Sequence, residues 1–259
     1  MKLYYDNEMN VFDELHYLQK NECLIISDRE NSITYKRTAK IIDDIIEGKS
    51  LRNWVDNSSS SNPPDLINDK DGLMMEIMRI DDHSPDGKVN PHLAKQRQLS
   101  KELEAFMEQF PKDTKLIINS VTNLPTEEDH NYKNYYSSFE RTVKKHLSKI
   151  ERYKKNFPNK KMIFLVLDET SGAYFERINS SVFNIGRPHL WFCDNRFLDS
   201  FIDSNLDYLI WYKPFQLINT NQGMLDLPKL AIFDIQNVHK GNCLVRINYN
   251  QNKMVSTEK

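Results

Sequence analysis

Cysteine is scarce in this sequence of 259 residues, which has only Cys23, Cys193 and Cys243. An odd number of distant cysteines without paired zinc-type spacing argues against a disulfide framework and favours a reducing compartment. No segment approaches the roughly 20 apolar residues of a membrane span. The start of the chain, Met1 to Asp6, has no long apolar core and does not resemble a secretory signal. We therefore expect a cytoplasmic protein without a membrane segment.

An excess of positive charge is also missing, because the net charge is −2. No global basic field attracts nucleic acid, so such binding would need a local patch. Apolar residues make up 39% and charged residues 28%, which is ordinary for a globular chain that can bury a sizeable core. We expect an α/β core with N-terminal helices over residues 1–180. Residues 181–259 would extend this domain or form a small second lobe.

The apolar pattern predicts alternating strands and helices. A strand at 115–121, a long amphipathic helix at 135–157 and a buried strand at 161–167 indicate a parallel crossover. Further strands are predicted at 188–194, 207–211 and 230–235, and helices at 92–110 and 196–203. The predicted fold class is therefore α/β, with a central mixed sheet flanked by helices.

The most informative stretch is a predicted β-hairpin over residues 62–81. Asp71 and Gly72 form its turn, because this dipeptide supplies the positive φ that such turns require. Asp65 begins the first strand, and Glu76 lies among apolar residues of the second. A carboxylate inside an apolar strand must be desolvated, paired or bound to a metal, and Asp65 stands near it across the hairpin. The alternative is that Asp65 belongs to a turn and Glu76 faces solvent on an edge strand.

Pro64-Asp65 followed by Glu76-Ile77-Met78 resembles the active-site hairpin of the restriction-endonuclease-like, or PD-(D/E)XK, nuclease superfamily. The resemblance implies a restriction-endonuclease-like fold and a Mg²⁺ or Mn²⁺ ion held by Asp65, Glu76 and the backbone carbonyl of Ile77. It also implies hydrolysis of phosphodiester bonds in nucleic acid, and we expect the substrate to be DNA. Restriction, phage defence and DNA processing are the corresponding roles.

The motif departs from the family at Met78, which stands where the catalytic lysine would be. Arg79 is a poor substitute because it points to the opposite face of the strand. Some relatives carry the lysine on the next helix, where this chain offers Lys95, although a solvated lysine is the simpler explanation. Gln96 and Gln98 lie in the same helix, and a third acid could come from Glu14, Asp43 or Glu47.

A second hypothesis keeps this fold without catalysis. Met78 then marks an inactive site, and the aromatic C-terminal third binds a protein partner in a regulatory role. The sequence also leaves open a homodimer.

Four other groups of residues have both a functional and a structural explanation. Asp81, Asp82 and His83 suit a second metal or a solvated loop, and Asp168 and Glu169 suit a ligand at a sheet edge or a helix cap. The aromatic residues of the final third suit base stacking or the core. The basic residues near the end of the long helix suit a phosphate backbone or a solvated face: Lys144, Lys145, Lys149, Arg152, Lys154, Lys155, Lys160 and Lys161.

Overall fold

The computed structural model describes residues 23–26, 54–57, 64–82, 131–170, 172–178, 186–202, 204–213, 217–220, 223–226, 229–235 and 246–257, with isolated helical positions between 98 and 110. The predicted helix at 92–110 lies largely outside these residues, and the predicted strand at 115–121 lies wholly outside them. None of the described helices is long and apolar enough to cross a membrane.

A seven-stranded mixed sheet forms the centre of the described structure, in the order β1-β11-β8-β5-β4-β3-β2. Its central strands β4, β5 and β8 are parallel, β3 and β2 join antiparallel at one end, and β11 pairs antiparallel with β8 and parallel with β1. The predicted mixed α/β sheet is confirmed. The strands are β1 (Cys23–Ile26), β2 (Val55–Asp56), β3 (Leu66–Asn68), β4 (Leu73–Ile80), β5 (Lys161–Asp168), β8 (Tyr208–Tyr212) and β11 (Leu230–Asp234).

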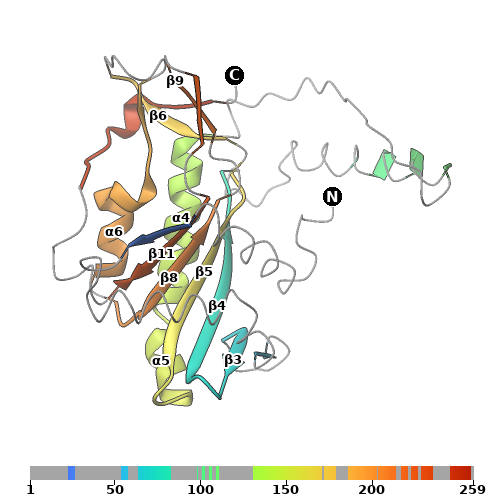
Figure 1. Cartoon of the computed structure of the whole chain (residues 1–259), viewed down its shortest axis with the longest axis vertical. Coiled ribbons are helices and arrows are strands. Elements are labelled where there is room, and N and C mark those ends of the chain that lie inside the picture. Colours follow the sequence, from blue (N-terminus) through green and yellow to red (C-terminus); the bar gives the residue numbers. More distant parts are fainter. Residues whose placement is uncertain are drawn as a thin grey trace.

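Helices α4 (Tyr132–Leu147), α5 (Ile150–Asn156) and α6 (Asn195–Ile202) pack against one face of this sheet (Figure 1). The side chain of Asn131 caps α4 by accepting a hydrogen bond from the backbone of Asn134. The single helix predicted at 135–157 is wrong, because the chain tightens at Lys149, whose N–H bonds to the carbonyl of His146 three residues earlier. Two helices result, and they join β4 to the parallel strand β5.

Alternating side chains of β4 separate two apolar clusters, one on each face of the sheet. Met74 and Met78 join the cluster under the helices, whereas Met75 and Ile77 join the cluster on the opposite face. Because Glu76 has the same parity as Met74 and Met78, its side chain points toward α4 and α5.

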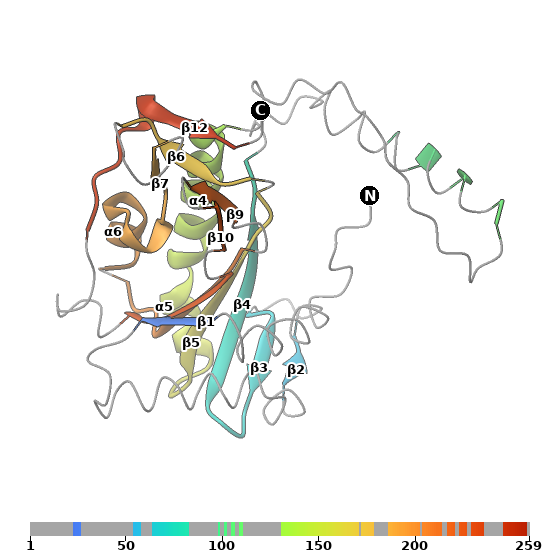
Figure 2. The ribbon, with the colours of Figure 1, turned by 45° about the horizontal axis from the view of Figure 1, so that its top comes forward.

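A small sheet lies beside the start of α4, in the order β12-β6-β7 (Figure 2). It comprises β6 (Tyr174–Glu176), β7 (Arg187–Pro188) and β12 (Met254–Ser256), and a separate hairpin pairs β9 (Leu217–Thr220) with β10 (Gly223–Asp226). The strand predicted at 188–194 is wrong, because β7 ends at Pro188 and a 3₁₀ turn follows at Trp191–Cys193. The strands predicted at 207–211 and 230–235 are confirmed to within one residue.

Candidate functional site

The hairpin brings Asp65 and Glu76 together, as predicted. Leu66 pairs with Met75, so Asp65 lies opposite Glu76 just beyond the last paired residues. Gly72 provides the expected positive φ of 65° in the turn. The Oδ2 atom of Asp65 accepts a hydrogen bond of 2.7 Å from the backbone N–H of Ile77. The two carboxylates therefore share one face of the sheet, and Asp65 is anchored to the strand that carries Glu76.

Glu76 is buried, with only 3% of its surface exposed, so the solvent-facing alternative is wrong. Its Oε1 atom accepts a 3.0 Å hydrogen bond from the hydroxyl of Tyr153 in α5. The Nδ1 atom of His146, near the end of α4, lies 2.6 Å from the same oxygen, in a contact that is not directed as a hydrogen bond. The other oxygen, Oε2, is buried and accepts no hydrogen bond from the described residues. One oxygen of the Glu76 carboxylate, Oε1, is therefore held by its contacts, while Oε2 is left unsatisfied by the described residues.

The surroundings of Asp65 shift the pKa of its carboxyl group in opposite directions. Burial raises the pKa of this carboxyl above its usual value, and the negative charge of Glu76 raises it further. The N–H of Ile77 and the nearby basic residues His146 and Lys149 lower the pKa of Asp65, but the net direction is upward. Lys149 lies in the turn between α4 and α5. Two basic residues of the helices therefore face a pair of crowded carboxylates.

Met78 is almost fully buried in the apolar cluster under the helices, at 3% exposure. Arg79 points to the opposite face, as predicted, where its Nη1 atom lies 3.4 Å from Oε1 of Glu169. Gln98 bonds to Glu102 and does not reach the hairpin. The remaining predicted candidates lie outside the described residues: Glu14, Asp43, Glu47, Lys95 and Gln96. In the part of the chain that the structure describes, no three His, Cys, Asp or Glu side chains form a group spaced to hold a metal.

A second polar cluster lies at the carboxyl ends of β4, β5 and β8. Asp168, at the end of β5, accepts hydrogen bonds from the hydroxyl of Tyr135 (2.7 Å), from Nε1 of Trp211 (3.1 Å) and from Thr170. The Nζ atom of the buried Lys213 lies 3.7 Å from the same carboxylate. The predicted helix cap is wrong for Asp168, because strand β6 follows it. This carboxylate is a buried acceptor that ties β5, β8 and α4 together.

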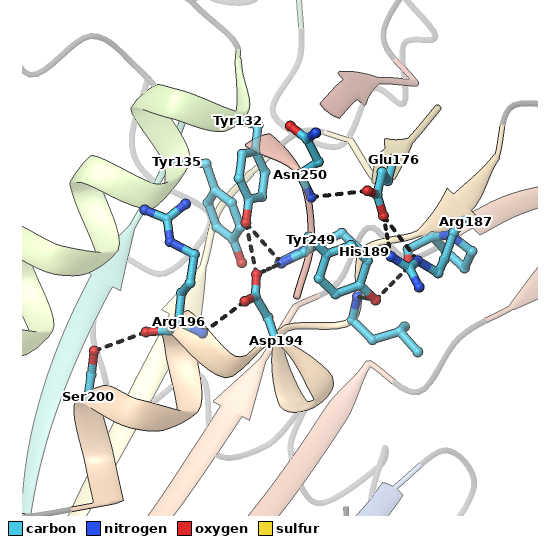
Figure 3. A network of polar contacts seen from close by, with 12 residues as sticks. Tyr132, Tyr135, Glu176, Arg187, His189, Asp194, Arg196, Ser200, Tyr249 and Asn250 are labelled. Atoms are coloured by element: carbon cyan, nitrogen blue, oxygen red, sulfur yellow. Dashed lines mark hydrogen bonds and ion pairs between the residues drawn. The ribbon is translucent and has the colours of Figure 1, made fainter. Parts of the chain in front are cut away.

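The cluster continues to the start of α6 (Figure 3). Oδ2 of Asp194 accepts a 2.9 Å hydrogen bond from the hydroxyl of Tyr132 and lies 2.9 Å from Nε2 of His189. Burial lowers the pKa of His189, and Asp194 offsets only part of this effect. The predicted solvated loop is wrong for Asp82, which is buried and accepts a 2.5 Å hydrogen bond from the hydroxyl of Tyr174. His83 lies outside the described residues. In the described structure these carboxylates are held by hydrogen bonds within the fold, which explains how the elements are joined.

The aromatic residues of the final third belong mainly to the core. Trp191 and Trp211 stack at 4.1 Å between ring centroids and are 3% and 1% exposed. Tyr208 and Tyr212 are also buried. These four rings are not available to stack on bases, and Phe215 lies outside the described residues.

His146 and Tyr153 are site residues that sequence reasoning missed, and Lys149 was named only as one of the basic residues near the end of the long helix. Their spacing of three and four positions placed them on one side of a helix, which was a usable signal. Nothing in the sequence indicated that this side faces Asp65 and Glu76, because that depends on how α4 and α5 cross the sheet.

No protein-family model, curated protein or solved structure matches this chain. The chemistry of the site must therefore be argued from its own geometry. That geometry comprises two adjacent carboxylates, one unsatisfied buried oxygen and two basic residues within electrostatic reach.

Proposed function

We propose that the protein is a divalent-metal-dependent nuclease whose ion binds at Asp65 and Glu76. The observation that carries the proposal is Oε2 of Glu76, which is sealed from water, has no hydrogen-bond donor among the described residues and stands beside a second carboxylate. A buried anionic oxygen without a partner is strongly unfavourable. A cation between the two carboxylates would remove that cost and would offset the repulsion that raises the pKa of Asp65.

The donor atoms at this position suit a hard divalent ion. The N–H of Ile77 points toward Asp65, and in a strand the carbonyl of the same residue points to the same side. Two carboxylates and this carbonyl offer the oxygen ligands that Mg²⁺ prefers, with water completing its shell. The same oxygen donors suit Mn²⁺ as well. The residues present therefore fit Mg²⁺ or Mn²⁺.

Each side chain around the site would have its own role in phosphodiester hydrolysis. A bound ion would activate water and polarise the phosphate. Tyr153 and His146 fix the orientation of Glu76 through Oε1, which leaves Oε2 for the ion. Lys149 provides the positive charge that Met78 cannot, and a cation here would stabilise the negative charge that grows on the phosphate. Lys95 remains a predicted alternative for that role.

The order of elements supports the further proposal that the fold is restriction-endonuclease-like. An antiparallel hairpin carries both carboxylates, and two helices then lead to a strand parallel to its second arm. DNA is the proposed substrate, and phage defence and DNA processing are the proposed roles.

One observation favours the rival function. Met78 is packed in the core at the position where the resemblance requires a lysine, which would suit a catalytically inactive fold that binds a protein partner. The two hypotheses differ in whether the site binds a metal and cuts nucleic acid.

Cleavage of supercoiled plasmid, single-stranded DNA and structured RNA with Mg²⁺ or Mn²⁺ tests the proposal. We expect metal-dependent cutting by the wild type and its loss in Asp65→Asn and Glu76→Gln. Asp199→Asn is the matched control, because this acid is exposed and pairs only with Arg246 in the described structure. Absence of cutting on every substrate, together with no heat of Mn²⁺ binding in calorimetry, would refute the nuclease and favour the protein-binding role.

A further inference from the structure

Eight basic residues of the segment from α4 to the start of β5 fall into two sets. Members of the first set have partners that neutralise or bind them. The Nζ atom of Lys144 lies 2.6 Å from Glu140, that of Lys154 lies 2.9 Å from Asp207 and that of Lys160 lies 2.6 Å from Asp69, whereas Lys161 donates to the hydroxyl of Tyr208. These paired residues are typical of a solvated protein surface, so this part of the basic cluster needs no ligand to explain it.

The second set consists of Arg141, Lys145, Lys149 and Arg152, which we call the basic stripe. Their side chains form no ion pair with the described residues, and the guanidinium of Arg152 lies only over the neighbouring ring of Tyr153. Arg141, Lys145 and Arg152 are exposed, and Lys149 is half-buried. Arg141 and Lys145 lie four positions apart on one side of α4, and Lys149 and Arg152 follow in the turn and in the first part of α5.

The position of the basic stripe follows from three contacts. His146 at the end of α4 lies 2.6 Å from Glu76, and Tyr153 in α5 bonds to the same carboxylate at 3.0 Å, so the turn that carries Lys149 between them lies beside the hairpin. Lys154 reaches Asp207 at the start of β8, which is the opposite flank of the same helices. Lys149 and the stripe residues around it therefore lie near the two carboxylates, whereas the paired Lys154 lies toward β8.

Like charges four positions apart destabilise a helix, and α4 contains one such pair of the basic stripe, Arg141 with Lys145. A bound polyanion would remove this repulsion. Arg141 and Lys145 lie about 6 Å apart along α4 at 1.5 Å per residue, which corresponds to about two phosphates of one strand at 3.4 Å. We infer that the basic stripe binds the phosphodiester backbone of nucleic acid and leads it to Asp65 and Glu76. This inference rests on the proposed function for its end point and adds the surface that recognises the substrate.

Binding can be measured without cleavage in the Glu76→Gln background. The test variant carries Arg141→Gln, Lys145→Gln and Arg152→Gln, and it keeps Lys149 because that residue belongs to the proposed site. The matched control carries Lys133→Gln, Lys144→Gln and Lys253→Gln, which removes the same charge from exposed positions outside the stripe. Fluorescence anisotropy with labelled duplex DNA, single-stranded DNA and RNA of one sequence would report affinity between about 50 and 200 mM salt. Circular dichroism confirms that both variants fold.

We expect the test variant to bind at least about tenfold more weakly, with a salt dependence reduced by about one unit of slope for each lost phosphate contact. The control should stay within about twofold of the Glu76→Gln parent. Equal losses in both variants, or none in the test variant, would overturn the inference. Stripe-dependent binding to phosphatidylserine vesicles without binding to any nucleic acid would also overturn it.

The outcome separates the two proposals. If metal-dependent cutting does not depend on the basic stripe, the nuclease proposal stands and the proposal that the stripe binds nucleic acid is wrong. If nucleic acid binds through the stripe but is not cut, the binding proposal stands and the nuclease proposal is wrong.

Discussion

The hydroxyl of Tyr153 donates a hydrogen bond to Oε1 of Glu76 across 3.0 Å and thereby joins α5 to the middle of β4. Hydrogen bonds to a charged group contribute about 1.5 to 3 kcal/mol to stability, and a buried acceptor that loses its donor keeps its desolvation cost. Tyr153→Phe should therefore lower the free energy of unfolding by about that amount, as measured by urea denaturation.

Tyr136→Phe provides the matched control for this prediction. Tyr136 also bonds to a glutamate, Glu140, but both residues are partly exposed and water can replace the hydroxyl. We expect a loss below about 0.5 kcal/mol, as for most surface changes. Similar losses in the two variants would mean that Tyr153 does not support a buried charge.

Metal binding should stabilise the folded protein independently of any catalytic assay. An ion that binds only the folded state raises the free energy of unfolding by about 2.7 kcal/mol at a hundred times its dissociation constant. We expect Mn²⁺ to raise the melting temperature of the wild type and of Asp199→Asn but not that of Glu76→Gln. A shift of equal size in all three proteins would place the ion elsewhere.

Asp168→Asn should be among the most destabilising substitutions in the described structure. The change leaves the buried Lys213 ammonium without its counter-charge, and breaking a buried pair in this way costs about 3 to 5 kcal/mol. The exposed pair of Arg246 and Asp199 should show how little a surface ion pair contributes, at about 0 to 1 kcal/mol. Chemical denaturation of Asp168→Asn and Asp199→Asn makes the comparison.

Stability should fall as the pH drops through the range in which an unfolded histidine takes up a proton. Burial lowers the pKa of His189 in the folded protein, so below about pH 6.5 the unfolded chain binds a proton that the folded chain does not. The free energy of unfolding then rises with pH across this window. His189→Gln should flatten part of that slope between about pH 7.5 and 5, and an unchanged slope would contradict a neutral buried His189.

Gly186→Ala should disrupt the pairing of β6 with β7. Gly186 has a φ of 144°, and an added Cβ would lie 2.2 Å from the backbone oxygen of Glu176. Gly223→Ala is the control, because its φ of 121° is also unfavourable but nothing lies within 4 Å of the added atom. The difference in melting temperature between the two variants isolates the clash from the backbone strain.

The hairpin was predictable because its signals are local. Asp71 and Gly72 specify the turn, and the apolar run around Glu76 specifies a buried strand, so Asp65 and Glu76 could be paired from sequence alone. The buried strand at 161–167 was equally clear, since a continuous apolar run is typical of a strand covered on both faces.

The remainder of the site depends on tertiary packing that local patterns do not encode. His146, Lys149 and Tyr153 reach the carboxylates only because α4 and α5 cross β4 at this point. The break at Lys149 was missed because its sequence is compatible with a continuous helix. For Asp168 the sequence left a ligand site and a cap open, because nothing in it indicated that Tyr135 and Trp211 would meet this carboxylate.

The pairing of β1 with β11 places Cys23 beside Leu230, so a strand near the beginning of the chain completes the sheet against one of its last strands. During synthesis from the N-terminus, β1 is made long before β11, so until β11 has been made β1 lacks the hydrogen bonds that pair the two strands. Pairing between such distant segments also slows folding, because a very long loop has to close. This edge of the sheet should therefore be the last to form, and chaperones or aggregation would compete for it during that interval.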